Sequence, residues 1–173
     1  MSTIGLQLRG IFRNLNEHYI TTQTFVISRL FINQKLTDMK KDNDELAKSF
    51  CESWSTHDGE KMVSLFANNF TYEEVCSGRI FSDRDGLIGY VNATCSGAPD
   101  LIMKSVSVTS NDKQLVIEWI FNGTNTVGWP NIPANNRTFN LKGVSVMEIE
   151  NGKIKHNREY WDMQTFAKAV GAN

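Results

Sequence analysis

The sequence predicts an α+β fold, with helices on one face of a bent antiparallel sheet. The first observation is the order of the elements: helices come first, followed by a strand, a helix and four more strands. The second is the pair Asn151-Gly152 between the last two strand-like stretches. Asn-Gly is the strongest short hairpin signal, because both positions tolerate positive φ. There are no internal repeats and no low-complexity segments.

Four helices are expected after Met39. The first carries apolar residues at helical spacing, namely Leu46, Ala47, Phe50, Cys51 and Trp54. Asp58 can cap the second helix, and Ser82-Asp-Arg-Asp85 forms a capping box for the third. Asp162 is expected to cap a short last helix that stops at Gly171.

Five stretches read as strands. The first is Phe70-Thr-Tyr-Glu-Glu-Val75, and the others are residues 101–109, 114–122, 137–150 and 153–161. A tight turn at Asp112-Lys113 and the polar loop 123–136 separate the middle strands.

Residues 1–38 differ in composition from the domain predicted for residues 39–173. They are rich in arginine and poor in acidic residues, and Leu6, Leu8, Ile11, Phe12 and Leu15 form a loose helical stripe. Three interpretations stay open: a mitochondrial targeting segment of a protein that is otherwise expected in the cytoplasm, a helix that packs on the domain or a partner, or a start codon set too early.

The bulk composition is that of an ordinary globular protein. The chain has 173 residues, of which 40% are hydrophobic and 21% charged, with a net charge of −1. This charge offers no general basis for binding nucleic acid, and no apolar run reaches the roughly 20 residues of a membrane-spanning helix. Cys51, Cys76 and Cys95 are widely spaced, which predicts free thiols and no zinc site.

Six short stretches, taken in order and spacing, carry a family resemblance. They are Phe70-Thr-Tyr-Glu-Glu, Gly78-Arg-Ile-Phe-x-x-Arg-Asp-Gly86, Trp119-x-x-x-Gly-Thr124, Ile132-Pro-Ala-x-x-Arg-x-Phe139, Gly143-Val-Ser-Val-Met147 and Asn151-Gly-Lys-Ile-x-x-x-Arg-Glu-Tyr-Trp-Asp162. Over about residues 40–171 the chain resembles the SnoaL-like polyketide cyclases of the nuclear transport factor 2-like superfamily, which includes the ketosteroid isomerases. The resemblance implies a cone-shaped barrel in which a curved antiparallel sheet wraps around helices, a scaffold that hosts many functions.

The resemblance makes two carboxylates candidates for proton transfer. In the cyclases an aspartate at the place of Glu159 acts as acid and base, and here the carboxylate stands on one more methylene. In the ketosteroid isomerases the proton-shuttling carboxylate falls near Glu74. Strand alternation sends Glu73 and Glu74 to opposite faces, so one of them can enter a pocket. The alternative for each glutamate is a solvated or ion-paired position.

Three polar residues are expected beside these carboxylates. Tyr72 shares the face of Glu74 and is expected to orient it. Ser145 stands where the isomerases have a neutral acid and where a cyclase histidine falls nearby. A hydroxyl there donates a hydrogen bond but carries no charge at neutral pH. Arg158, next to Glu159, is a further candidate for binding substrate.

Aromatic residues are candidates for lining a ligand pocket. Trp119 and Phe121 share one face of their strand, and the resemblance turns Trp119 toward the cavity, where it suits a flat polycyclic ligand. Trp129, in the loop Gly128-Trp-Pro-Asn-Ile-Pro133, is expected to cover the mouth as part of a lid. Plain core packing is the alternative for each of these residues.

Three functions follow from this reading. The first is a cyclase or isomerase that needs no cofactor or metal and acts on a hydrophobic carbonyl compound. The second is a non-catalytic protein that binds such a small molecule. The third is an interaction module, since a homodimer is expected from this fold. Epoxide hydrolysis, as in the limonene epoxide hydrolases, ranks lower because Arg158 lacks a flanking pair of aspartates.

Overall fold

A computed structural model describes the backbone of residues 3–172 and the side chains of residues 28–38 and 40–172. The chain divides into two units, Met1–Met39 and Lys40–Asn173. Its elements are α1 (Thr3–Ser55), α2 (Gly59–Ser64), β1 (Phe66–Glu74), β2 (Arg79–Phe81), α3 (Arg84–Ser96), β3 (Ile102–Ser110), β4 (Gln114–Thr124), β5 (Gly128–Trp129), β6 (Ile132–Pro133), β7 (Thr138–Glu150), β8 (Lys153–Trp161) and α4 (Met163–Val170).

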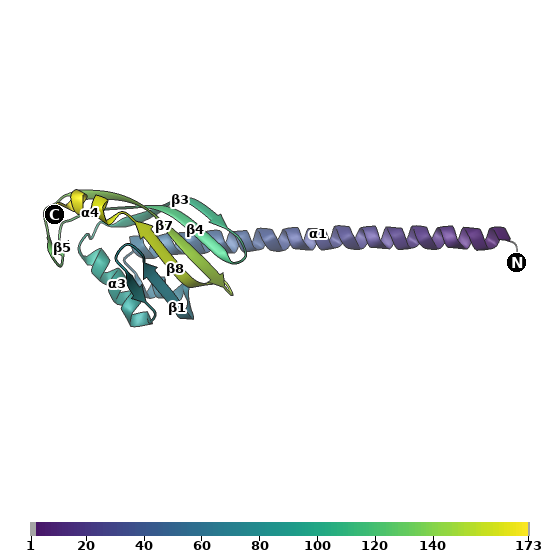
Figure 1. Cartoon of the computed structure of the whole chain (residues 1–173), viewed down its shortest axis with the longest axis horizontal. Helices are drawn as coiled ribbons and strands as arrows, with labels where there is room; N and C mark the ends of the chain where they lie inside the picture. Colours follow the sequence, from purple (N-terminus) through teal and green to yellow (C-terminus); the bar gives the residue numbers. More distant parts are fainter. Residues whose placement is uncertain (1–2, 173) are drawn as a thin grey trace. The chain divides into compact units, whose positions relative to one another are not determined.

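The second unit is built on one mixed sheet. Its strands lie in the order β2-β1-β8-β7-β4-β3, and the long strands form a strongly curved layer (Figure 1). The α+β class is confirmed, but the sheet is not wholly antiparallel, because β1 pairs with β8 in parallel. Parallel neighbours need a long connection and cannot be joined by a tight turn. Here the connection is most of the domain, so strands from near its two ends lie side by side.

Two short strand pairs were not expected. Strand β2 pairs with the end of β1, and Arg79 lies opposite Glu74 in this ladder. Within the predicted loop 123–136, strands β5 and β6 pair through two residues each. Both ladders are too short to leave a period-2 pattern in the sequence, which explains why sequence reasoning missed them.

Strand β1 begins at Phe66, four residues before the predicted strand, but local signals placed several other boundaries correctly. Asn151 and Gly152 adopt positive φ angles of 52° and 73° in the turn between β7 and β8. The side chain of Asp58 accepts a hydrogen bond from the Lys61 amide at the start of α2. Asp162 caps α4 in the same way, and Gly171 ends it in the left-handed conformation. Helix α3 differs by one residue, because Asp83 rather than Ser82 is its cap.

Apolar side chains from the helices meet the concave face of the sheet. The predicted stripe of α1 supplies Ala47, Phe50, Cys51 and Trp54, all of which are buried. The ring of Trp54 makes edge contacts with Tyr90 of α3 and Phe121 of β4, at 5.8 and 5.4 Å between ring centroids. Burying a large apolar side chain contributes roughly 1.5–3 kcal/mol, so this core supports the curvature of the sheet.

In the first unit, Leu30, Phe31, Ile32 and Leu36 are exposed. The stripe predicted from Leu6 to Leu15 lies outside the described side chains. The role of residues 1–38 therefore stays a prediction.

Candidate functional site

A cavity of about 370 Å³ opens inside the second unit. Its volume falls in the range of small-molecule sites. Most of its wall is aromatic or aliphatic, and the polar groups are few. The lining residues are Trp54, Glu74, Arg79, Tyr90, Ala93, Thr94, Leu101, Met103, Trp119, Phe121, Trp129, Pro130, Ile132, Phe139, Leu141, Glu159, Trp161 and Phe166.

Four polar residues form one row across neighbouring strands of the sheet. Arg79 on β2 lies opposite Glu74 on β1, and Glu74 lies beside Glu159 on β8. Ser145 on β7 follows on the other side of Glu159. Neighbouring strands are about 4.8 Å apart, so this register brings the two carboxylates next to each other.

Glu159 is 3% exposed and receives a directed hydrogen bond. The indole Nε1–H of Trp119 donates to Ser145 Oγ at 2.9 Å, and the Ser145 hydroxyl donates to Glu159 Oε1 at 3.1 Å. An indole N–H can only donate, so Ser145 must accept from Trp119 and its own proton is free to point at the carboxylate. These two hydrogen bonds in series hold the Glu159 carboxylate in one orientation.

Burial raises the pKa of Glu159 to about 7, with a further increase from the charge of Glu74. Hydrogen bonding by Tyr72 and Ser145 acts in the opposite direction. Tyr72 is thus close enough to affect this carboxyl, although its buried hydroxyl lies outside strict hydrogen-bonding geometry. A carboxyl of this pKa can both take and return a proton near neutral pH.

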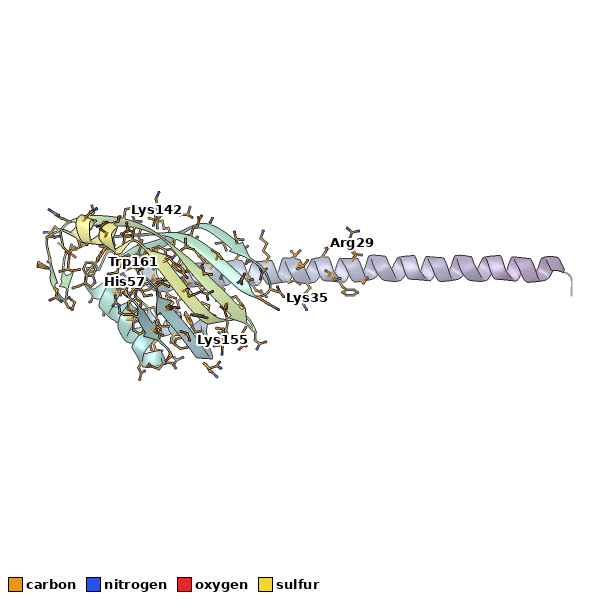
Figure 2. All side chains as sticks on the ribbon, viewed as in Figure 1. Arg29, Lys35, His57, Lys142, Lys155 and Trp161 are labelled. Carbon is orange, nitrogen blue, oxygen red and sulfur yellow. The ribbon has the colours of Figure 1, made fainter. Side chains whose placement is uncertain are left out.

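Trp119 can occupy its place because Gly143 faces it. A Cβ atom added to Gly143 would lie 2.2 Å from the Trp119 ring, far inside van der Waals contact. Gly143 lies opposite Trp119 on one side and Trp161 on the other, in the row next to the polar row. Trp161, the last residue of β8, is labelled in Figure 2.

Glu74 is buried but neutralised by a partner at the edge of the sheet. Arg79 Nε lies 2.8 Å from Glu74 Oε2, and the Ser77 hydroxyl donates to the same oxygen. The guanidinium of Arg79 lies over the ring of Tyr90, 5.3 Å from its centroid, and more than half of the Arg79 side chain is exposed. Burial and the charges of Glu159 and Glu74 raise the pKa of Tyr90 well above its usual value, so its hydroxyl stays protonated.

The predicted aromatic residues Trp119, Phe121 and Trp129 all line the cavity. Trp129 donates from Nε1 to the Thr94 carbonyl at 2.8 Å and packs against Gly97. These contacts fix it in the wall.

The other predicted site residues lie elsewhere. Tyr72 and Ser145 are fully buried behind the lining, where Ser145 contacts Glu159. Arg158 lies on the opposite face of β8 and forms an ion pair with Glu148 at 3.3 Å, so we do not assign it a contact with ligand.

Sequence reasoning did not select Arg79 or Tyr90, although both line the cavity. Arg79 stands within the quoted stretch Gly78-Arg-Ile-Phe, shortly after Glu74. The sequence offered one signal for Arg79, which is a basic residue soon after a candidate carboxylate. The three-residue strand that directs Arg79 toward the cavity is too short to be predicted from the sequence.

Within residues 28–38 and 40–172, no group of three histidine, cysteine, aspartate or glutamate side chains is arranged to hold a metal ion. Among the described residues, no helix is long and apolar enough to cross a membrane. Cys51, Cys76 and Cys95 are free thiols.

Comparison with known proteins identifies the fold. The family model of the SnoaL-like polyketide cyclases matches residues 44–170. None of the curated proteins matches the sequence. A candidate polyketide cyclase from Xanthomonas campestris pv. campestris is 18% identical, with a TM-score of 0.69 over 76% of this chain and 98% of that one.

Two further structures are similar. IdmH, a candidate polyketide cyclase from Streptomyces antibioticus, is 17% identical with a TM-score of 0.66, over 75% of this chain and 98% of that one. A protein of ketosteroid isomerase-like fold from Catenulispora acidiphila, in complex with trimethylamine, is 14% identical with a TM-score of 0.65, over 75% and 94%. At these identities the likeness concerns the fold, and the predicted ketosteroid isomerase-like architecture is confirmed.

Proposed function

The chain belongs to the SnoaL-like polyketide cyclase family, and from this premise we propose that it is a cofactor-free acid–base catalyst acting on a hydrophobic carbonyl compound. The observation that carries the proposal is Glu159, a buried carboxyl with a pKa of about 7 at the wall of an apolar cavity. The nearby indole rings suit a flat or polycyclic ligand.

Glu159 removes a proton from the carbon next to the carbonyl. The C–H bond breaks, its electron pair moves into an enolate, and the proton resides on Glu159. Return of that proton to another carbon is an isomerisation. Attack of the enolate carbon on a second carbonyl instead closes a ring, and the alkoxide oxygen formed from that carbonyl takes up the proton from Glu159. Ser145 and Trp119 hold the carboxylate in place throughout, since neither needs to change its own protonation.

A suitable probe is 5-nitrobenzisoxazole, a flat apolar C–H acid. A carboxylate base removes its ring proton, the N–O bond breaks, and a coloured nitrile-phenolate forms. We expect Glu159→Gln to lower this rate by roughly 10²- to 10⁴-fold, the usual contribution of a positioned base. The matched control is Glu73→Gln, which removes the neighbouring carboxylate of β1 that pairs with His156 on the other face of the sheet.

The pH dependence adds a second readout. Because the base must be ionised, the wild-type rate should rise with pH and level off above about 7. An equal rate in wild type and Glu159→Gln would reject the proton-transfer role.

A second candidate function is non-catalytic binding of the same ligand class. Ser145 supports it, because the polar row holds an uncharged hydroxyl there. The resemblance places a cyclase histidine near this position. Binding of an aromatic ligand with no turnover of the probe would favour this alternative. A homodimer remains part of the proposal, with its mass in solution as the test.

A further inference from the structure

Arg79 is the single cationic side chain among the residues that line the cavity. It reaches the lining from the edge strand β2, where its backbone lies opposite Glu74. In the polar row, Arg79 and Ser145 therefore stand at the two ends with both carboxylates between them.

Only one nitrogen of the Arg79 guanidinium, Nε, makes polar contacts with the described residues. Its Nε lies 2.8 Å from Glu74 Oε2 and donates to Ser77 Oγ at 3.0 Å. The two terminal nitrogens make no hydrogen bond to the described residues. Four N–H donors on these nitrogens are thus available to a ligand, in the planar arrangement that suits an anionic oxygen.

The orientation of this free edge is restrained. Stacking over Tyr90 and the contact with buried Glu74 limit the rotamers of Arg79, although its side chain is more than half exposed. Less conformational freedom then has to be lost when a ligand binds.

We infer that Arg79 holds the negatively charged oxygen of an enolate or phenolate in the cavity, and that Glu74 is a positioning residue for Arg79. The inference rests on the proposed proton transfer to Glu159 and names the group that stabilises its product. A preorganised cation beside a developing oxyanion is among the strongest sources of catalysis.

The charge balance agrees with this assignment. Before proton transfer, the charges of Glu74 and Arg79 offset each other and Glu159 carries the base's negative charge. Afterwards Glu159 is neutral and the negative charge lies on the ligand oxygen. The charge has moved within the same row, so Ser145 does not have to supply any positive charge.

The test uses 4-nitrophenol as an enolate mimic, because its anion absorbs visible light and its neutral form does not. The protein carries Glu159→Gln, which imitates the neutral carboxyl present after proton transfer. Arg79→Gln is added to this background, and Arg84→Gln is the matched control, since Arg84 forms an exposed ion pair with Glu60.

We expect Arg79→Gln to weaken phenolate binding by about 10- to 100-fold, the loss typical of a charged hydrogen bond. Binding of the neutral methyl ether 4-nitroanisole should change little, which separates loss of the charge contact from damage to the cavity. Phenolate binding no tighter than that of 4-nitroanisole, undetectable phenolate binding, or a loss that Arg84→Gln reproduces would each overturn the inference.

Kinetics tests the role of Glu74. With Glu159 intact, Arg79→Lys should recover part of the kcat that Arg79→Gln loses on 5-nitrobenzisoxazole. In Glu74→Gln, the pH dependence of the rate should still show a single ionisation, that of Glu159. If Glu74→Gln abolishes turnover while phenolate binding stays intact, Glu74 transfers protons itself and the inference fails. The proposed function fails separately, through an unchanged rate in Glu159→Gln.

Discussion

The two faces of strand β8 carry ionisable groups in opposite surroundings. On the inner face, Glu159 is buried beside the cavity and takes a hydrogen bond from Ser145. On the outer face, Arg158 pairs with Glu148 at 3.3 Å and His156 lies 3.5 Å from Glu73, all partly in solvent.

This difference indicates that environment, and not residue type, separates a carboxyl with a raised pKa from an ordinary one. Water screens the outer pairs, so each is expected to contribute little to folding. Exclusion of water on the inner face disfavours the charged form of Glu159 and raises its pKa.

The largest effect on stability is expected from removing the inner support. Trp119→Ala deletes a ring that is 3% exposed and leaves Ser145 without its donor. We expect a loss of about 3–5 kcal/mol in the free energy of unfolding, measured with urea. Val144→Ala, at a partly buried position of the neighbouring strand, is the control and should cost far less. Equal losses of unfolding free energy in Trp119→Ala and Val144→Ala would contradict the supporting role of Trp119.

A smaller effect is expected from pH. In the folded protein Glu159 has a pKa of about 7, against a usual value of 4.5, so between these values the folded state keeps a proton that the unfolded state releases. The contribution is complete below pH 4.5 and is lost as the pH rises through 7, a change of about 3 kcal/mol. The measurement is urea unfolding of wild type and of Glu159→Gln at both ends of this pH window. The change in the free energy of unfolding that wild type shows and Glu159→Gln lacks is the contribution of Glu159. If Glu148→Gln lost the same pH-dependent stability relative to wild type, the assignment to Glu159 would be contradicted.

Gly143→Ala should cost about 1–3 kcal/mol, because the new methyl group would displace the Trp119 ring. It should also slow the reaction of 5-nitrobenzisoxazole, since Ser145 loses its fixed partner. The control is Gly89→Ala in helix α3, where a Cβ atom meets nothing within 4 Å and alanine favours the helix. A Gly143→Ala protein as stable as Gly89→Ala would refute this account of the glycine.

The smallest effect belongs to the outer face. Arg158→Gln breaks a partly exposed ion pair and should change the free energy of unfolding by less than about 1 kcal/mol. Turnover should not change, because Arg158 does not line the cavity. A loss of turnover on the scale of Glu159→Gln would return Arg158 to the site.

Local reasoning recovered much of the fold and part of the site. The turn at Asn151-Gly152, the caps at Asp58 and Asp162, and the inward faces of the long strands all follow from short-range patterns. Such patterns depend on neighbouring residues alone. The ladder that turns Arg79 inward involves three residues, too few to show a pattern.

By itself, the sequence determined which residues could form the longer strands and the capped helices, where the last hairpin turns, and which side chains share a face. Backbone propensity and side-chain alternation are properties of a few consecutive residues. Only the tertiary structure decided that β1 lies parallel to β8, which places Glu74 beside Glu159 and Arg79 next in the row. It also decided how deeply Glu159 is buried, because the exclusion of water and the sum of nearby charges arise from residues distant along the chain.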